Sequence, residues 1–250
     1  MARFVLVHGA FSGAWIWGPL EARLKAAGHT TAAFDLPGLG DDQTPAEQVT
    51  LDSSAARVCE VVESGSEPAI LVGHSMGGII ATQAAARCPA KLVALAYVAA
   101  FLPKDGQSLL ALTHLPEGAG DQVQANIVVT DDPPVAVMAE AASKESLYAC
   151  CSDEVAEWAI ARQCPQPLAP MGTPVSIPAH AFDHIARYYV QCMQDRAIPP
   201  ALQKRMIAEN ECSGVYELDT DHTPHLSRTE ALAGILDEIA ADAALGSSQT

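Results

Sequence analysis

The sequence predicts an α/β fold with a mostly parallel sheet of about six strands, flanked by helices, and a helical cap inserted before the last two strands. Short apolar runs alternate with segments of helical periodicity, a pattern that favours parallel strands joined by crossover helices. Some runs are apolar at successive positions, as in AILVG at 69–73. Strands buried on both faces of a sheet have this composition, so the sheet is expected to lie inside the molecule.

The first half of the chain contains four of these strands with helices between them. The segment 17–29 has Leu20 and Leu24 at helical spacing and Gly28 as a stop signal, and the segment 53–65 begins with serines and ends at a glycine. The expected strands are 3–9, 30–40, 69–73 and 91–101, and the expected helices are 17–29, 53–65 and 76–88.

The alternation stops between about Pro103 and Asp183, where prolines, glycines and short helical patterns follow one another. It resumes with strands at 186–192 and 215–218 and helices at 199–210 and 228–245. An insertion between two strands of one sheet is expected to cover the carboxyl edge, where open α/β sheets bind ligands. The expected organisation is therefore a core of residues 1–102 and 184–250 with an inserted cap of residues 103–183.

Composition narrows the function classes. The 250 residues suffice for one core with an inserted subdomain, and a net charge of -16 disfavours nucleic acid and anionic lipid as partners. The N-terminal segment does not read as a signal peptide, and no apolar run approaches the roughly 20 residues of a membrane span. A cytoplasmic location is expected. The seven cysteines show no pairing framework or metal-ligand spacing, so we expect buried apolar thiols and no metal.

Ser75 is the candidate nucleophile. It lies in Gly73-His74-Ser75-Met76-Gly77, which matches G-x-S-x-G between an expected strand and an expected helix. A sharp turn there strains the serine backbone and lifts its hydroxyl off the sheet. A side chain at either flanking glycine would clash with the neighbouring strand or helix, which explains both glycines.

A serine hydroxyl needs a base to become nucleophilic, and the base needs an acid to orient it. Of the eight histidines, His222 follows the expected last strand by a short polar loop, and His225 lies nearer the final helix. We therefore favour His222 and retain His225 as the alternative.

Asp195 is the candidate acid, because it follows the end of the strand at 186–192 on a loop before a helix that begins with proline. Asp105, Asp219 and Asp221 compete for this role. The last two lie too close to His222 in sequence to reach its ring easily.

The second oxyanion donor is expected from the loop after the first strand, HGAFSGAW. The backbone N–H of Ala10 would act with that of Met76. Phe11 is either pocket wall or loop packing, and Trp15 is assigned to packing.

These residues together resemble the α/β-hydrolase superfamily, in particular its plant methylesterase and hydroxynitrile lyase group. The resemblance rests on FVLVHGAFSGAWIW, FDLPGLG, ILVGHSMGG, YYVQCMQDRAIPPALQKRM and DHTPHLS, and covers the whole expected sheet. It implies the α/β-hydrolase fold, Ser75, Asp195 and His222 as a catalytic triad, and the N–H groups of Ala10 and Met76 as an oxyanion hole.

The same resemblance separates two chemistries. Lyase members that resemble the rubber-tree type carry a threonine after the first-strand histidine and a lysine after the catalytic histidine, where this chain has Gly9 and Thr223. Hydrolysis of small to medium apolar carboxylic esters through an acyl-enzyme is therefore expected. The alternatives are a hydroxynitrile lyase, a lactone, thioester or carbamate hydrolase, and a slow-turnover ligand receptor.

The expected partner is a small-molecule ester substrate. No cofactor is expected, and a homodimer is a possible assembly. The candidate substrate-binding residues are Phe11, Phe101, Trp158, Leu168 and Met171.

Overall fold

The computed structural model describes residues 1–246. A six-stranded sheet forms its centre, in the order β2-β1-β3-β4-β8-β9, and every neighbouring pair is parallel. The prediction of about six parallel strands is confirmed. The strands are β1 (Arg3–Val7), β2 (Thr30–Ala33), β3 (Ala69–Ser75), β4 (Leu92–Ala100), β8 (Ala186–Cys192) and β9 (Gly214–Leu218).

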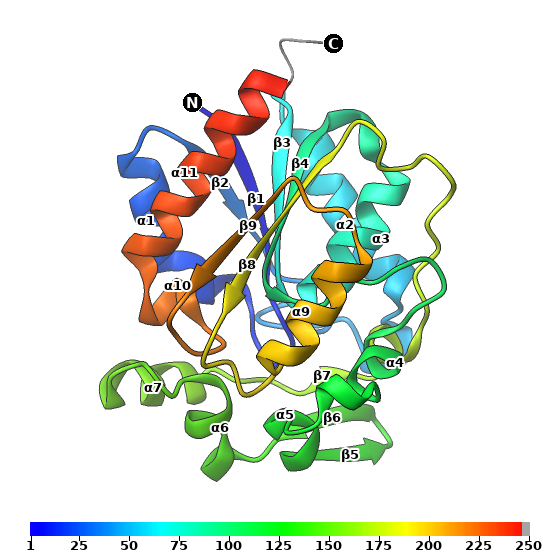
Figure 1. Ribbon diagram of the computed structural model, residues 1–250. Helices are drawn as coiled ribbons and strands as arrows, with labels where there is room; N and C mark the ends of the chain where they lie inside the picture. The colour runs from blue at the N-terminus through cyan, green and yellow to red at the C-terminus, as the bar shows by residue number, and fades with distance from the viewer. Residues whose placement is uncertain (247–250) are drawn as a thin grey trace.

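Helices cover both faces of the sheet (Figure 1). They are α1 (Gly18–Ala26), α2 (Leu51–Ser64), α3 (Gly77–Arg87), α9 (Pro200–Glu209), α10 (Pro224–Ser227) and α11 (Thr229–Gly246). Short 3-10 helices connect them at η1 (Ala14–Trp17), η2 (Ala46–Gln48) and η3 (Pro89–Lys91). The start of α2 is well defined because Thr50 and Ser53 cap each other's backbone N–H groups.

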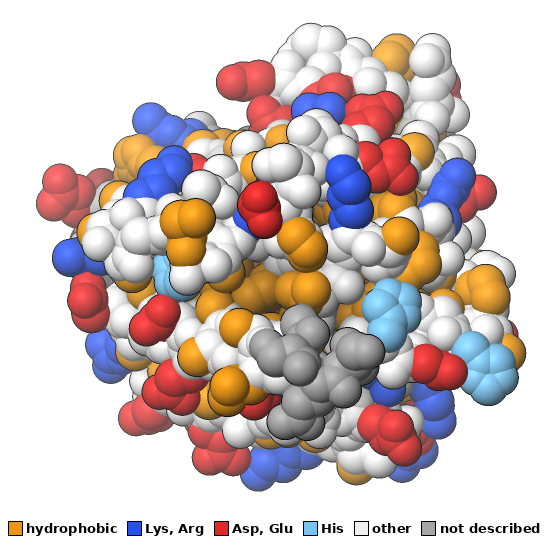
Figure 2. Space-filling view, turned by 90° about the horizontal axis from the view of Figure 1, so that it is seen from above, with side chains coloured by type: hydrophobic (Ala, Val, Ile, Leu, Met, Phe, Trp, Pro, Cys, Tyr) orange, Lys and Arg blue, Asp and Glu red, His pale blue; other side chains and the backbone are white. Residues whose placement is uncertain are grey.

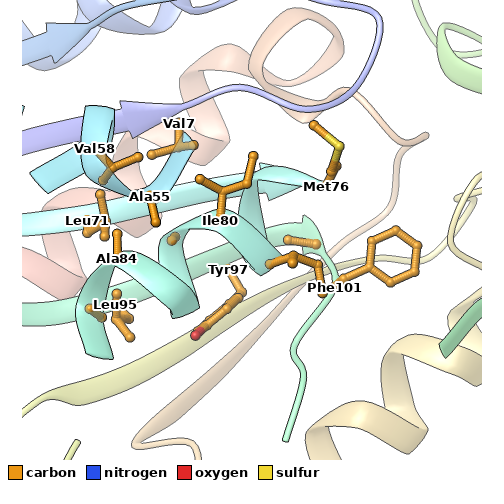
Figure 3. Close-up of a cluster of buried hydrophobic side chains, with 14 of the residues drawn as sticks. Val7, Ala55, Val58, Leu71, Met76, Ile80, Ala84, Leu95, Tyr97 and Phe101 are labelled. Carbon is orange, nitrogen blue, oxygen red and sulfur yellow. The ribbon is translucent and has the colours of Figure 1, made fainter. Parts of the chain in front are cut away.

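Successive residues of the central strands β1, β3 and β4 enter two different cores, as the period of a β-strand requires. Val5, Leu71 and Tyr97 pack with α2, α3 and α9 in one core, part of which Figure 3 shows. Phe4 and Val72 pack with α1 and α11 in the other. The sheet is therefore buried on both sides, as its continuous apolar runs predict.

Two cysteines differ from the sequence expectation. Cys59 of α2 and Cys88 at the end of α3 form a disulfide, with their Cα atoms 5.8 Å apart. The expectation of unpaired thiols is wrong for this pair, because α2 packs on α3 and brings together cysteines 29 residues apart. The other five cysteines are free: Cys150, Cys151, Cys164, Cys192 and Cys212.

The part of the segment between β4 and β8 that holds its helices and strands lies beneath the carboxyl ends of the strands (Figure 1), and residues 173–185 then run back to the start of β8. Besides helices it contains a three-stranded antiparallel sheet, so the prediction of a purely helical cap is incomplete. The elements are α4 (Leu109–Thr113), η4 (Pro116–Gly118), α5 (Gln122–Asn126), β5 (Ile127–Asp131), β6 (Pro134–Met138), α6 (Glu140–Leu147), α7 (Asp153–Ile160), β7 (Gln166–Pro167) and α8 (Ala169–Gly172).

The opposite end of the molecule is seen in Figure 2, where charged side chains surround a hollow with an apolar floor. Residues at the amino ends of β4 and β8, such as Leu92 and Tyr188, line a hollow at this end. This hollow is at the opposite edge of the sheet from Ser75, which ends β3 at the carboxyl edge.

Candidate active site

Ser75 lies at the sharp turn between β3 and α3, and its backbone φ is +53°. Residues other than glycine rarely adopt this left-handed backbone conformation. A Cβ at Gly73 would lie 2.7 Å from the carbonyl oxygen of Gly77, and one at Gly77 would lie 2.6 Å from that of Val7. The explanation of both glycines by steric exclusion is confirmed.

The loop after β1 approaches Ser75 closely. A Cβ at Gly9 would lie 2.8 Å from the Cβ of Ser75, so only glycine fits there. In the described part of the chain, no protein acceptor takes the backbone N–H of Ala10 or of Met76. Both residues line the same pocket as Ser75. Two backbone donors of this kind are free to bind an oxyanion.

The conformation of this loop is held from two sides. Nε2 of His8 accepts the N–H of Leu36 at 3.1 Å, so Nδ1 carries the proton and donates to the carbonyl of Gly9 at 2.8 Å. Burial lowers the pKa of His8 and keeps the ring neutral. From the insertion, the N–H of Cys164 donates to the carbonyl of Phe11, whose φ is +60°.

Asp195 and His222 form a buried pair. Nδ1 of His222 lies 2.9 Å from Oδ2 of Asp195, and the two residues are 2% and 4% exposed. An ionised carboxylate only accepts hydrogen bonds, so Nδ1 carries the proton and Nε2 keeps its lone pair. His222 thereby has the tautomer that a general base requires.

Other donors saturate the Asp195 carboxylate. Oδ1 accepts the backbone N–H groups of Ala197 at 2.8 Å and Ile198 at 2.9 Å, and Oδ2 also accepts Nε2 of Gln203 at 3.0 Å. Gln203 is held in turn by the backbone of Cys192 at the end of β8. The carboxylate is therefore fixed in orientation before any ligand binds.

The competing aspartates have other partners. Asp105 accepts the N–H of Ile177, and Asp219 accepts the side-chain amide of Gln194. Asp221 accepts the N–H of Cys150 at 2.7 Å and the hydroxyl of Ser227 at 2.7 Å, which orders the loop that carries His222. Among the acids weighed from the sequence, Asp195 is the one that contacts the His222 ring.

The His74 ring packs against the rings of both His222 and His225. Nε2 of His74 lies 2.9 Å from the carbonyl of His222, and the ring centroids of His74 and His225 are 4.5 Å apart. Neither ring nitrogen of His225 has a hydrogen-bond partner within residues 1–246. Burial, and secondarily the charge of His222, lower the pKa of His225 to about 3. His225 is a neutral, buried ring that does not line the pocket.

The pKa of His222 moves in the opposite direction. Burial alone lowers it, but the charge and hydrogen bond of Asp195, together with the charges of Asp221 and Asp121, raise it above 6.5. A raised pKa makes Nε2 of His222 a stronger base toward the proton of the Ser75 hydroxyl.

A pocket of about 560 Å³, counting its mouth toward solvent, opens between the sheet edge and the insertion. Of the five candidate substrate-binding residues, Phe11, Phe101 and Met171 line it. Trp158 and Leu168 do not. The Trp158 ring packs edge-on against Trp15, with centroids 5.1 Å apart, and Leu168 packs on the core. The assignment of Trp15 to packing agrees with this contact.

Several lining residues were not expected from the sequence. They are Ser12, Ile16, His74, Leu109, Asp121, Val123, Gln124, Leu147, Tyr148, Ala197, Ile198 and Thr223. Half of them come from the insertion, which carries no motif, so only the folded chain reveals those. Asp121 is the one acidic residue among the described lining residues, which include no lysine or arginine.

Residues 1–246 contain neither a candidate metal site nor a helix suited to a bilayer. No group of three or more His, Cys, Asp or Glu side chains there could hold a metal ion. No helix in the same range is both long enough and apolar enough to cross a bilayer.

Comparison with known proteins agrees with this architecture. The model of a family described as the alpha/beta hydrolase family matches residues 4–235. The chain is 32% identical over 249 residues to putative methylesterase 14, chloroplastic, of Arabidopsis thaliana, covering 95% of this chain and 72% of that protein. It is 33% identical over 250 residues to the alpha-hydroxynitrile lyase of the same plant, covering 96% and 97%.

A crystal structure of polyneuridine aldehyde esterase superposes with a TM-score of 0.85 at 25% identity, covering 96% of this chain and 99% of that one. The resemblance drawn from the sequence motifs is thereby confirmed over nearly the whole chain.

Proposed function

The chain belongs to the alpha/beta hydrolase family, and from that membership we propose that it is a carboxylesterase using Ser75, His222 and Asp195 as its triad. The observation that carries the proposal is the bond between Asp195 and Nδ1 of His222. It leaves Nε2 as the basic nitrogen of a residue that lines the same pocket as Ser75. Relatives named methylesterase support the same reaction class.

In the proposed reaction, His222 takes the proton of the Ser75 hydroxyl as its oxygen attacks the ester carbonyl. The N–H groups of Ala10 and Met76 bind the resulting oxyanion, each contributing roughly 3 kcal/mol in comparable sites. His222 then protonates the leaving alcohol. Water attacks the acyl-enzyme by the same route and releases the acid.

The segment 103–183 is proposed to act as the cap of this site. Its side chains make the pocket largely apolar, through residues such as Leu109, Leu147 and Met171. Apolar walls favour small to medium esters with a hydrocarbon acyl or alcohol group.

The test is the initial rate on p-nitrophenyl esters of increasing acyl length, measured for the wild type and Ser75→Ala. We expect release of p-nitrophenol by the wild type and a loss of about a thousandfold or more in the variant. Ser64→Ala is the control, because Ser64 is exposed at the end of α2 and does not line the pocket. Full turnover by a folded Ser75→Ala protein would refute the proposal.

Hydroxynitrile lyase activity is the second candidate, because a relative with that name is 33% identical. Cyanide leaves as an anion, and a cation near it would lower the barrier. The described pocket lining has no lysine or arginine, and Asp121 adds negative charge. We therefore expect negligible cyanide release from mandelonitrile by a preparation that hydrolyses p-nitrophenyl esters.

The cytoplasmic location and the homodimer remain predictions. Some relatives carry the word chloroplastic in their names, and the Cys59–Cys88 disulfide is a feature that reducing compartments disfavour. Fractionation of the native cells and light scattering of the purified protein test the two predictions separately.

A further inference from the structure

Asp121 is an unexpected group in an otherwise apolar pocket. It precedes α5 and lines the pocket together with Val123 and Gln124 of that helix. The N–H of Gln122 donates to the carbonyl of Arg196 at 2.8 Å, which ties this segment to the loop that carries Asp195. The carboxyl group is therefore held on the insertion side of the pocket, near the proposed acid and base.

Only one oxygen of this carboxyl group is used by the fold. Oδ1 accepts the N–H groups of Val123 at 2.8 Å and Gln124 at 2.9 Å and so caps α5. No donor in residues 1–246 bonds Oδ2, nor is Oδ2 among the fully buried atoms that lack a partner. Oδ2 is thus available to a ligand.

The charge state of Asp121 suits an interaction with a donor. Burial raises its pKa to about 6, although the N–H groups of Gln124 and Val123 and the charge of His222 act in the opposite direction. The carboxyl group is therefore mostly ionised at neutral pH. A partly buried carboxylate strongly favours an ammonium or hydroxyl donor and disfavours a second anion.

Ser12 is a second polar residue of the pocket lining whose side chain has no partner among the described residues. The residue is 4% exposed, and its Oγ makes no hydrogen bond within residues 1–246. This Oγ is fully buried, so a ligand would reach it only after the Ser12 side chain rotates toward the pocket. The accessible unpaired polar atom of this pocket is therefore Oδ2 of Asp121, and it indicates a substrate that is itself not purely hydrocarbon.

We propose that Asp121 is a specificity-determining residue, and that the preferred substrates are esters bearing an amine or hydroxyl donor within a few bonds of the scissile carbonyl. The proposal rests on the proposed esterase function. It modifies the expectation of purely apolar esters. It also implies that esters carrying a free carboxylate are poor substrates. For the same reason, the carboxylate product should bind weakly.

The test compares kcat/KM at pH 7 on esters of similar shape. On the acyl side these are methyl 3-aminopropanoate, methyl butanoate and monomethyl succinate. On the alcohol side they are 2-(dimethylamino)ethyl butanoate and 3-methylbutyl butanoate. On the acyl side, the alcohol side or both, we expect kcat/KM of the wild type to be about tenfold higher for the ammonium ester than for its hydrocarbon counterpart. On the acyl side, we expect kcat/KM for monomethyl succinate to be about tenfold lower than for methyl butanoate.

Asp121→Asn is the informative variant, because asparagine keeps an oxygen that caps α5 and removes only the charge. We expect it to bring these ratios close to one, whatever its rate on methyl butanoate, because each ratio compares two esters with the same protein. Asp183→Asn is the matched control, since Asp183 pairs with His180 on the surface. Asp121→Ser retains a capping oxygen and replaces the asparagine variant if that variant does not fold.

The outcomes separate this inference from the proposed function. Hydrolysis of methyl butanoate with ratios near one in the wild type, or with ratios unchanged in Asp121→Asn, overturns the role of Asp121 and leaves the esterase proposal intact. Absence of hydrolysis of every ester by the folded wild type overturns both.

Discussion

Gln203 donates from its side-chain amide to Oδ2 of Asp195 at 3.0 Å, the same oxygen that lies 2.9 Å from Nδ1 of His222. The amide of Gln203 also bonds both backbone groups of Cys192. One buried side chain therefore connects the end of β8 to the proposed acid. Its role is to position Asp195, and it does not line the pocket.

We predict that Gln203→Leu lowers kcat by about tenfold with little change in KM, because Asp195 loses one of the donors that orient it. The N–H of Cys192 would also lose its partner, which should lower the free energy of unfolding by about 2 kcal/mol. Ester kinetics and urea unfolding check the two effects. Gln43→Leu, on an exposed loop, is the control. Unchanged kcat in Gln203→Leu would contradict the positioning role.

The backbone conformation of Ser75 is predicted to lower the stability of the protein while serving catalysis. Both Ser75→Gly and Ser75→Ala should be inactive, but glycine adopts φ near +53° without strain. We expect the glycine variant to be more stable than the alanine variant by about 0.5 to 1 kcal/mol. At Ser53, in the first turn of α2, the order should reverse because the backbone is helical. Equal stability of the two Ser75 variants would argue against strain there.

The raised pKa of His222 predicts the acid limb of the pH profile. The base must be neutral to take the Ser75 proton, so kcat/KM should rise with pH through the pKa of free His222. The midpoint is expected above 6.5. Asp121 titrates nearby, with a pKa of about 6, so the limb must persist in Asp121→Asn if it belongs to His222. A midpoint at or below 6.5 would contradict the assignment.

His225 predicts how stability depends on pH. Its pKa is about 3 in the folded protein and near 6.5 in the unfolded chain, so the unfolded state binds more protons below pH 6.5. The free energy of unfolding should therefore fall as pH decreases from about 6.5 toward 3, by up to about 1.4 kcal/mol per pH unit from this group.

His225→Phe removes that contribution, and urea unfolding between pH 5 and 7.5 should show a shallower slope. His74 and His8 have lowered pKa values for the same reason, burial, so part of the slope should remain. His114→Phe, at an exposed position, should leave the slope unchanged. An identical slope in the His225 variant would show that this ring does not titrate on unfolding.

Local sequence determined much of this protein. The apolar runs and the spacing of their helices predicted the parallel sheet, because burial on both faces leaves a continuous apolar signature. The sequence also predicts the turn around Ser75, because a side chain at Gly73 or Gly77 would clash with the neighbouring helix or strand. Asp195 and His222 follow strand ends, and parallel strands bring such ends to one edge.

Tertiary structure alone decided what depends on contacts between distant segments. The Cys59–Cys88 disulfide requires α2 to pack on α3, and the antiparallel sheet of the insertion pairs strands that show no strong pattern. Trp158 looked suited to a pocket wall, yet it packs on Trp15. Asp121 carries no motif and reaches the pocket because α5 bonds the loop after β8. Sequence patterns report the local periodicity of burial, whereas a pocket is formed by side chains that only the complete fold brings together.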